Sequence, residues 1–158
     1  MKITIVCVGK LSLDFLHQGA DEYSKRVKRY AALKIIELKE EKGSGQNSAV
    51  AHIRARESQR LEEKIPAGAY CIVLDEIGRQ LSSDEFAAAL ERRMLHGSTD
   101  WCFIIGGAYG VSTELRKRAN MVMSLSRLTL THQMARVLLL EQLYRAFTIM
   151  RGEPYHNR

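Results

Sequence analysis

The sequence predicts a single α/β domain whose sheet is mainly parallel and lies between helices. Five short apolar segments alternate along the chain with longer segments of helical periodicity, which is the pattern of α/β proteins. Several of these segments, such as CIVL and FII, are apolar at every position, as strands are when helices cover both faces of their sheet. The length of 158 residues suits one domain, so residues 1–158 are assigned to it.

The five apolar segments are predicted to be strands because each is too short for a helix of ordinary length. They span residues 3–8, 33–38, 70–74, 101–105 and 121–125. The first lies in MKITIVCVGK, whose apolar run is too short for the core of a signal peptide and for a membrane span. We therefore expect a cytoplasmic protein with no membrane partner.

The first two segments between these strands carry helical and loop signals. The first has apolar residues at steps of three and four, namely Leu16, Ala20, Tyr23, Val27 and Tyr30. Residues 47–64 are predicted to form a charged surface helix with a thin apolar stripe of Ile53 and Leu61. Its basic residues could contact RNA, although a solvated face of mixed charge is the favoured interpretation. Residues 40–48 (EEKGSGQNS) have the composition of a mobile loop.

Two later helices are marked more clearly. One is expected to start at Ser82, because Glu85 can complete a capping box. The other spans residues 132–150 and has two apolar stripes, of which one can face the sheet and the other would need a second copy of the chain. The stripes are Val137, Leu140, Tyr144 and Phe147, and Leu139, Leu143 and Met150. A homodimer through this helix is therefore predicted, and Glu141 and Arg145 are spaced for an i,i+4 ion pair.

Charge and cysteine usage bear on the partners of the protein. The formal net charge of +6 and the pI of about 9.4 suit a polyanionic partner such as nucleic acid, although charge alone does not establish one. Cys7, Cys71 and Cys102 each lie inside an apolar segment and are expected to be buried, reduced thiols. Neither these cysteines nor the five histidines have metal-ligand spacing, so no metal site is predicted.

A glycine-rich turn follows the fourth predicted strand, in WCFIIGGAYG. Gly106, Gly107 and Gly110 come at the carboxyl end of a buried strand, where open α/β sheets bind their ligands. Glycine there lets a ligand approach the backbone closely. The spacing matches neither GxGxxG nor GxxxxGK[ST], so dinucleotide and P-loop sites are not indicated, and a tight turn without a ligand remains an alternative.

Two further segments have residues suited to binding. SLSRLTLTHQMAR is predicted to be a loop that offers backbone donors and acceptors, with Thr131 as a helix cap. The tail RGEPYHNR contains Tyr155, His156 and Arg158, which are suited to stacking on a base and contacting phosphate. A frayed end is the alternative interpretation of this tail.

Taken together, the motifs resemble the RlmH (YbeA) family of ribosomal RNA pseudouridine methyltransferases over essentially the whole chain. The resemblance is carried, in order, by MKITIVCVGK, VLDEIGRQLSSDEFA, FIIGGAYG, SLSRLTLTHQMARVLLLEQLYRAF and MRGEPYH. It implies a SPOUT fold with a C-terminal trefoil knot, an obligate homodimer, and S-adenosylmethionine as the methyl donor, with no metal. The implied reaction is methylation of N3 of a pseudouridine in large-subunit (23S) ribosomal RNA of assembled ribosomes.

The resemblance also implies roles for particular residues. Those that match the family's cofactor contacts are Leu74, Gly106, Leu125, Ser126, Arg127, Leu128, Thr129 and Leu130. The candidates for catalytic or orienting roles are His132, Arg145, Tyr155 and His156. We expect Arg145 and the tail pair to hold the nucleotide and His156 to accept the proton, because the pKa of histidine suits that role. Thr131 replaces a proline that is common in the family, which leaves the affinity for the cofactor open.

Two other functions remain compatible with the sequence. A non-catalytic protein that binds RNA or the ribosome could retain a SPOUT scaffold. A regulatory domain could use GGAYG to bind the phosphates of a nucleotide. Selective thermal stabilisation by S-adenosylmethionine, and not by ATP or NAD, would separate the regulatory domain from the methyltransferase.

Overall fold

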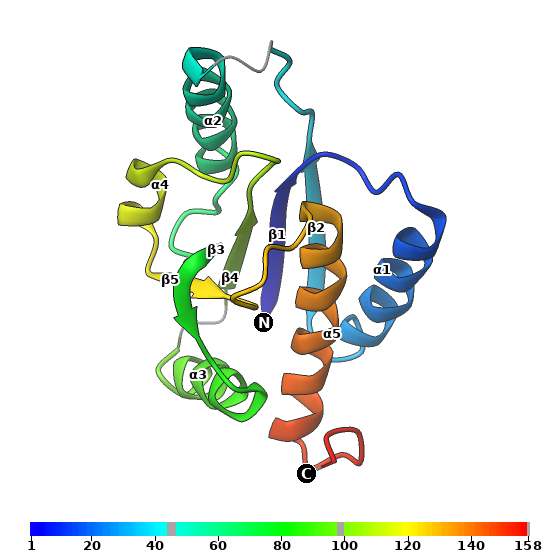
Figure 1. Cartoon of the computed structure of the whole chain (residues 1–158). Coiled ribbons are helices and arrows are strands. Elements are labelled where there is room, and N and C mark those ends of the chain that lie inside the picture. The colour runs from blue at the N-terminus through cyan, green and yellow to red at the C-terminus, as the bar shows by residue number, and fades with distance from the viewer. Residues whose placement is uncertain (44–46, 98–99, 158) are drawn as a thin grey trace.

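The structure is a computed structural model that describes residues 1–43, 47–97 and 100–157, without the side chains of 47 and 48. Its strands form one parallel five-stranded sheet in the order β2-β1-β4-β3-β5 (Figure 1). They are β1 (Lys2–Val8), β2 (Ala32–Leu38), β3 (Tyr70–Gln80), β4 (Asp100–Ile105) and β5 (Met121–Ser124). The predicted α/β class and all five predicted strand positions are confirmed.

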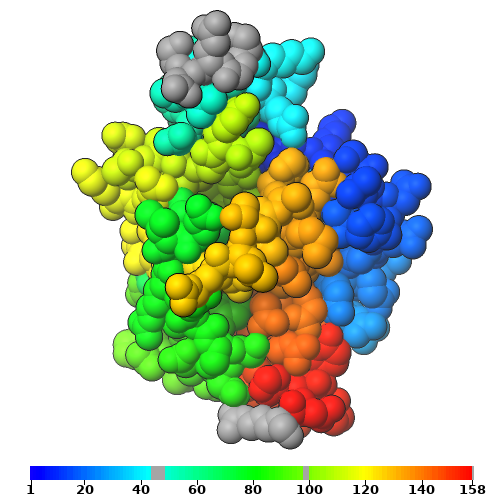
Figure 2. Space-filling view, viewed as in Figure 1, coloured from blue at the N-terminus to red at the C-terminus, as the bar shows by residue number. Residues whose placement is uncertain are grey.

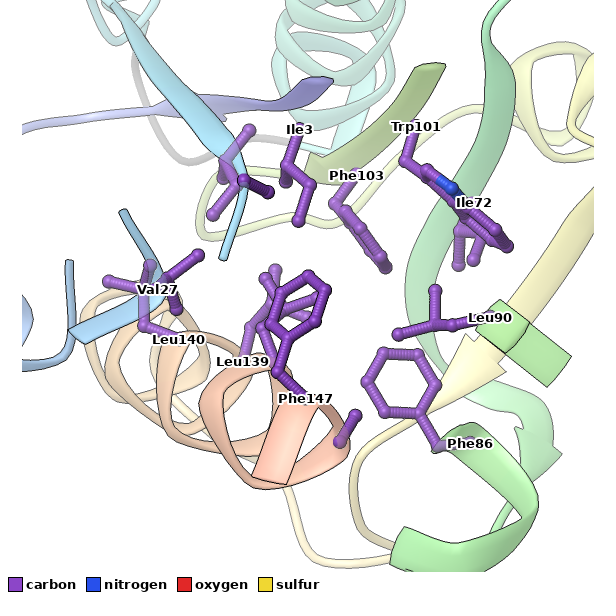
Figure 3. Close-up of a cluster of buried hydrophobic side chains, with 14 of the residues drawn as sticks. Ile3, Val27, Ile72, Phe86, Leu90, Trp101, Phe103, Leu139, Leu140 and Phe147 are labelled. Carbon is purple, nitrogen blue, oxygen red and sulfur yellow. The ribbon is translucent and has the colours of Figure 1, made fainter. Parts of the chain in front are cut away.

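Both faces of the sheet are covered, as the uninterrupted apolar segments predicted. Alternate residues of β4 enter two separate cores, with Phe103 and Ile105 on one face and Cys102 and Ile104 on the other. Figure 3 shows part of the first core, in which Phe103 and Trp101 of β4 lie opposite Phe86, Leu90, Leu139 and Phe147 from the helices. The three cysteines are buried and free, as expected.

The helices divide between the two faces of the sheet. On the face with the first core lie α1 (Asp14–Val27), α3 (Ser83–Leu95) and α5 (His132–Met150). On the other face lie α2 (Asn47–Glu62) and α4 (Thr113–Arg118), which contribute Leu61 and Leu115 to the second core. The predicted starts of α3 and α5 are confirmed, whereas α4 was not predicted because its six residues are too few to show a helical period.

Capping bonds account for the starts of α3 and α5. Ser82 accepts a hydrogen bond from the backbone N–H of Glu85 at 3.1 Å, and Glu85 accepts one from the N–H of Ser82 at 2.7 Å. The hydroxyl of Thr131 accepts from the N–H of Met134 at 3.2 Å. Each bond satisfies a helical donor that has no partner within its own helix, so it fixes where the helix begins.

Helix α5 is buried within the single chain, so its two apolar stripes do not by themselves indicate a dimer. Helix α5 lies between α1 and α3 over the sheet (Figure 1), and it contacts both of them. Leu139, Leu140 and Leu143 are all 0% exposed within the single chain. The expectation that one stripe needs a second copy was wrong, because two helices of the same chain flank α5.

Two further expectations change in detail. Strand β3 runs beyond Leu74 to Gln80, and its pairing with β5 is irregular between Leu74 and Arg79, where residues 75–78 bulge from the ladder. Helix α2 is a surface helix only on its outer side, because Glu57 and Ser58 are 3% and 2% exposed. The segment predicted as a mobile loop falls partly on residues 44–46, which lie outside the described residues.

Candidate active site

A cavity of about 430 Å³ lies at the carboxyl edge of the sheet, in the position where open α/β sheets bind ligands. Three segments form most of its wall, namely residues 74–77 after the regular part of β3, residues 105–111 after β4, and residues 124–130 without Arg127 after β5. Arg54, Arg116, His132 and Ala135 complete the lining. The strand order explains this assembly, because β3 lies between β4 and β5 and the ends of all three strands are neighbours.

Most residues that the family resemblance implied as cofactor contacts meet in this cavity. Seven of the eight line it: Leu74, Gly106, Leu125, Ser126, Leu128, Thr129 and Leu130. Arg127 is exposed and is not part of the wall. These residues come from three separate parts of the chain, so their convergence is a property of the fold. Their role in binding a cofactor stays a prediction.

The glycine turn after β4 requires its glycines for its own packing. A Cβ on Gly106 would lie 2.9 Å from the backbone of Gly110 and from Val111, and one on Gly107 would lie 2.6 Å from a carboxylate oxygen of Glu57. Gly110 has a positive φ of 73°, which side-chain-bearing residues rarely adopt. Gly106 was predicted to let a ligand approach the backbone, but the close packing of the turn on itself already excludes a side chain there.

Hydroxyl side chains shape the segment after β5. Ser124 donates a hydrogen bond to the carbonyl of Ser126 at 2.8 Å, and Ser126 accepts one from the N–H of Leu128 at 3.0 Å. Thr129 donates to a carboxylate oxygen of Glu76 at 3.2 Å, which ties the segment to the end of β3. In Figure 2 this segment, in gold, crosses the face of the molecule between the green β3 region and the orange α5. The segment is thus an ordered wall of the cavity.

Charged residues from three elements surround the cavity. Arg116 of α4 donates to Asp75 at 2.8 Å and to Thr113 at 3.2 Å, and the side chain of Asp75 is only 10% exposed. Arg54 enters the wall from α2. Asp75, Arg54 and Arg116 were not predicted as site residues. They come from three separate elements, and no spacing in the sequence relates them.

His132, the first residue of α5, lines the cavity and is largely buried. Its side chain is 16% exposed, and its Nε2 lies 3.7 Å from a carboxylate oxygen of Glu40. Burial lowers its pKa below the ordinary 6.5, and Arg136 acts in the same direction while Glu40 opposes them. The imidazole is therefore neutral near pH 7 and can accept a proton.

The other candidate catalytic residues form a second group on the tail. Arg145 donates to Nδ1 of His156 at 3.2 Å, and its guanidinium lies 4.8 Å from the ring centre of Tyr155. Tyr155 donates to Glu141 at 3.1 Å, and burial, followed by its bonds to Tyr23 and Glu141, raises the pKa of its phenol. The predicted ion pair of Arg145 with Glu141 is confirmed at 2.5 Å. Tyr155 and His156 of the tail are therefore docked on α5, and at these two residues the tail is not frayed.

Within one chain the two groups are far apart. Helix α5 has 19 residues, so its ends are separated by about 28 Å, and Arg145 lies about 20 Å along the helix from His132. Figure 1 shows the tail beyond the last turn of α5, whereas the residues of α5 that line the cavity, His132 and Ala135, belong to its first turn. None of Arg145, Tyr155 and His156 lines the cavity. Arg158, which was predicted to contact phosphate, lies outside the described residues.

The described part of the chain contains neither a metal-binding cluster nor a membrane-spanning helix. No three or more His, Cys, Asp or Glu side chains among residues 1–43, 47–97 and 100–157 are grouped so that they could hold a metal ion. No helix within the same ranges is both long and apolar enough to cross a membrane.

Comparison with known proteins connects this geometry to a family. A family model described as "Predicted SPOUT methyltransferase" matches residues 1–156. The chain is 56% identical over 158 residues to a Ribosomal RNA large subunit methyltransferase H from Syntrophotalea carbinolica, with 100% of both chains covered. It is 49% identical to a protein of the same name from Geobacter sulfurreducens, over 99% of this chain and 100% of that one.

Solved structures with low sequence identity share the fold. A probable methylase family protein from Haemophilus influenzae Rd KW20 gives a TM-score of 0.55 at 13% identity, covering 99% of this chain and 70% of that one. A probable methyltransferase from Bordetella pertussis Tohama I gives 0.54 at 13% identity, covering 91% and 95%. These likenesses concern the fold alone, whereas the family model and the two relatives span nearly the whole sequence. The chain belongs to the SPOUT methyltransferase family.

Proposed function

We propose that this protein transfers a methyl group from S-adenosylmethionine to N3 of a pseudouridine in large-subunit (23S) ribosomal RNA, acting on assembled ribosomes in the cytoplasm. One observation carries the proposal. The segments after β3, β4 and β5 that match the cofactor contacts of the family form a single cavity. Full-length relatives at 56% and 49% identity that are named Ribosomal RNA large subunit methyltransferase H support the choice of substrate.

The residues of the cavity fit S-adenosylmethionine. A volume of about 430 Å³ is within the usual range of small-molecule sites. The leucine side chains and backbone groups of residues 125–130, without Arg127, offer adenine an apolar surface with hydrogen-bonding groups. The carboxylates of Asp75 and Glu76 offer acceptors for ribose hydroxyls or the ammonium group. When bound, S-adenosylmethionine supplies a methyl group on a positively charged sulfur.

We further propose that the C-terminal part of the chain forms the trefoil knot of the SPOUT fold. Residues 124–130 form part of the cavity wall together with the glycine turn. Thr129 donates a hydrogen bond to Glu76, and α5 then begins beside Gly9. Membership of the family supports the knot. General topology rules alone would argue against it, because knotted chains are rare.

The active protein is proposed to be a homodimer in which the tail of one subunit completes the cavity of its partner. The support is the distance of about 20 Å along α5 between His132 and Arg145 within one chain. A nucleotide held by Arg145, Tyr155 and His156 is out of reach of the same subunit's cavity. In a twofold dimer each tail can serve the other subunit, so two equivalent sites would form.

The reaction needs a proton acceptor as well as alignment. The N3–carbon bond forms while the methyl carbon separates from sulfur, whose bonding electron pair stays on the sulfur as a thioether. The imide proton of N3 goes to a base, which we assign to Nδ1 of His156. This nitrogen accepts a hydrogen bond from Arg145 in the structure, so Arg145 must leave Nδ1 and bind the nucleotide as Nδ1 takes up the proton, while Tyr155 stacks on the nucleotide. Neutral His132 orients groups inside the cavity. Positioning and exclusion of water supply much of the acceleration.

The test is methyl transfer to ribosomes from cells that lack this activity. Purified protein is incubated with labelled S-adenosylmethionine and these ribosomes, or with protein-free ribosomal RNA, and the labelled nucleoside is mapped. We expect label at N3 of one pseudouridine in the large-subunit RNA of ribosomes and little in free RNA. Binding to ribosomes without any label would instead favour the non-catalytic RNA-binding protein, and label elsewhere would refute the proposed substrate.

A further inference from the structure

Among the cationic side chains of the cavity, Arg54 is the one that lacks an internal partner. Arg116 is held by Asp75 and Thr113, and His132 is neutral near pH 7. For Arg54 the described residues provide neither an ion pair nor a hydrogen bond, and its buried Nε has no partner among them. A guanidinium that is partly withdrawn from water without an acceptor is costly, and an anion in the cavity would relieve that cost.

The structure fixes the part of α2 from which Arg54 reaches the cavity. Glu57 and Ser58 follow it by three and four residues and therefore lie on the same face of α2. Glu57 accepts a hydrogen bond from the backbone of Glu41 at 2.9 Å, and Ser58 accepts one from the backbone of Ser112, just beyond the glycine turn, at 2.7 Å. The bond to Ser58 holds this face of α2 beside the turn, and the bond to Glu57 holds it to the segment after β2. Arg54 lies on the same face and lines the cavity.

None of the acidic side chains of α2 and the cavity among the described residues forms an ion pair with Arg54. Glu57 accepts from Glu41 through Oε1, while its Oε2 is buried against Gly107 without a hydrogen-bond partner among the described residues. Burial raises the pKa of this carboxyl group, and the hydrogen bond from Glu41 and the charge of Arg60 partly offset that rise. Asp75 pairs with Arg116, and Glu76 accepts from Thr129. No carboxylate of the described residues therefore neutralises Arg54 at ion-pair distance, and an anionic ligand in the cavity can do so.

We propose that Arg54 binds the carboxylate of the methionine part of S-adenosylmethionine. The inference rests on the proposed function, because it takes that ligand as the occupant of the cavity. The carboxylate is the one anionic group of the ligand, and a guanidinium binds carboxylates through two parallel hydrogen bonds. Arg54 thus determines whether the cavity selects the complete amino-acid part of the cofactor over adenosine alone.

The test compares ligands that differ only in this carboxylate. Titration calorimetry measures the binding of S-adenosylhomocysteine and of its decarboxylated analogue to the full-length protein and to R54Q, R54K and R56Q. Arg56 lies on the exposed side of the same helix, so R56Q is matched in charge and position. Thermal unfolding of each variant verifies that it is folded.

For R54Q we expect affinity for S-adenosylhomocysteine to fall about 10- to 100-fold and affinity for the decarboxylated analogue to change less than about twofold. R54K should recover part of the loss, and R56Q should bind both ligands as the unmodified protein does. An equal loss for both ligands would mean that Arg54 only shapes the cavity, and no loss, or a loss confined to RNA binding, would also overturn the inference. If the unmodified protein binds neither ligand, the proposed function fails together with this inference.

Discussion

The guanidinium of Arg136 donates a hydrogen bond of 2.7 Å to the backbone carbonyl of Gly9 and thereby joins the start of α5 to the end of β1. Arg136 is 1% exposed, and it also pairs with Glu37 of β2 at 2.5 Å. It lies one helical turn after His132, which packs over Gly9. The contact between Arg136 and Gly9, which are far apart in the sequence, thus fixes the start of α5, where the helix lines the cavity.

This contact predicts a large loss of stability for R136M. The substitution leaves the carbonyl of Gly9 and the carboxylate of Glu37 without their donor, so we expect the free energy of unfolding to fall by about 2 to 4 kcal/mol. Urea denaturation measures the change. R29M removes an exposed arginine and should change it by less than about 0.5 kcal/mol. Equal effects of the two variants would mean that the buried contacts of Arg136 add little.

The lowered pKa of His132 predicts acid sensitivity. The fold favours the neutral imidazole, so below the ordinary pKa of 6.5 the unfolded chain takes up a proton more readily than the folded one. Above pH 6.5 the titration of His132 therefore does not reduce the free energy of unfolding. As the pH falls from 6.5 toward the lowered pKa of His132, the free energy of unfolding decreases. Urea unfolding at about pH 7.5 and about pH 5.5 should show a smaller acid loss for H132Q than for H52Q, which changes an exposed histidine. Identical acid losses would contradict the assignment.

The role proposed for His156 predicts a loss of chemistry with little loss of fold. Single-turnover methylation of ribosomes by H156A should be slower by about 100-fold or more, because a general base usually contributes at least that factor. H17Q, which changes an exposed histidine of α1, serves as the control. An unchanged single-turnover rate for H156A would remove His156 from the role of proton acceptor.

Sharing of the site between subunits predicts complementation in mixed dimers. G106V introduces a side chain where a Cβ already meets the turn's backbone at 2.9 Å, and so should disable the cavity, while H156A disables the tail. Mixed in equal amounts after subunit exchange, the two inactive variants should recover about a quarter of the working sites, because only one site of each mixed dimer is intact. If each site belonged to one chain, the mixture would stay inactive. Light scattering verifies that the variants form dimers.

Burial of the three cysteines predicts that they do not react in the folded protein. Burial raises the pKa of Cys7 to about 11, and Cys71 and Cys102 are 4% and 0% exposed. The thiolate is the reactive form, so a thiol reagent near neutral pH should label none of them before unfolding and all three in denaturant. Rapid labelling of one thiol under native conditions would reveal an opening of the sheet that this structure lacks.

Much of the fold was predictable because its signals are local. The capping pairs Ser82 with Glu85 and Thr131 with Met134 depend on residues three positions apart. Several strands are apolar at every position, which indicates that helices must cover both faces of the sheet. The glycine turn and residues 125–130 were implied as a site by the family resemblance, and the structure brings them to one cavity. Their convergence follows from the strand order, which no local pattern specifies.

The sequence by itself determined the α/β class, the five strand positions, the starts of α3 and α5 and the family to which the chain belongs. Only the tertiary structure decided that α1 and α3 flank α5 and that its leucines at 139, 140 and 143 are buried within one chain. It also decided that Arg54 lines the cavity without a partner among the described residues, and that Arg145 lies far along α5 from His132. Periodicity specifies which side of a helix must be buried, because that depends on side chains a few residues apart. It does not specify which surface covers that side, because the covering residues come from distant parts of the chain and meet only when the sheet and its helices have packed.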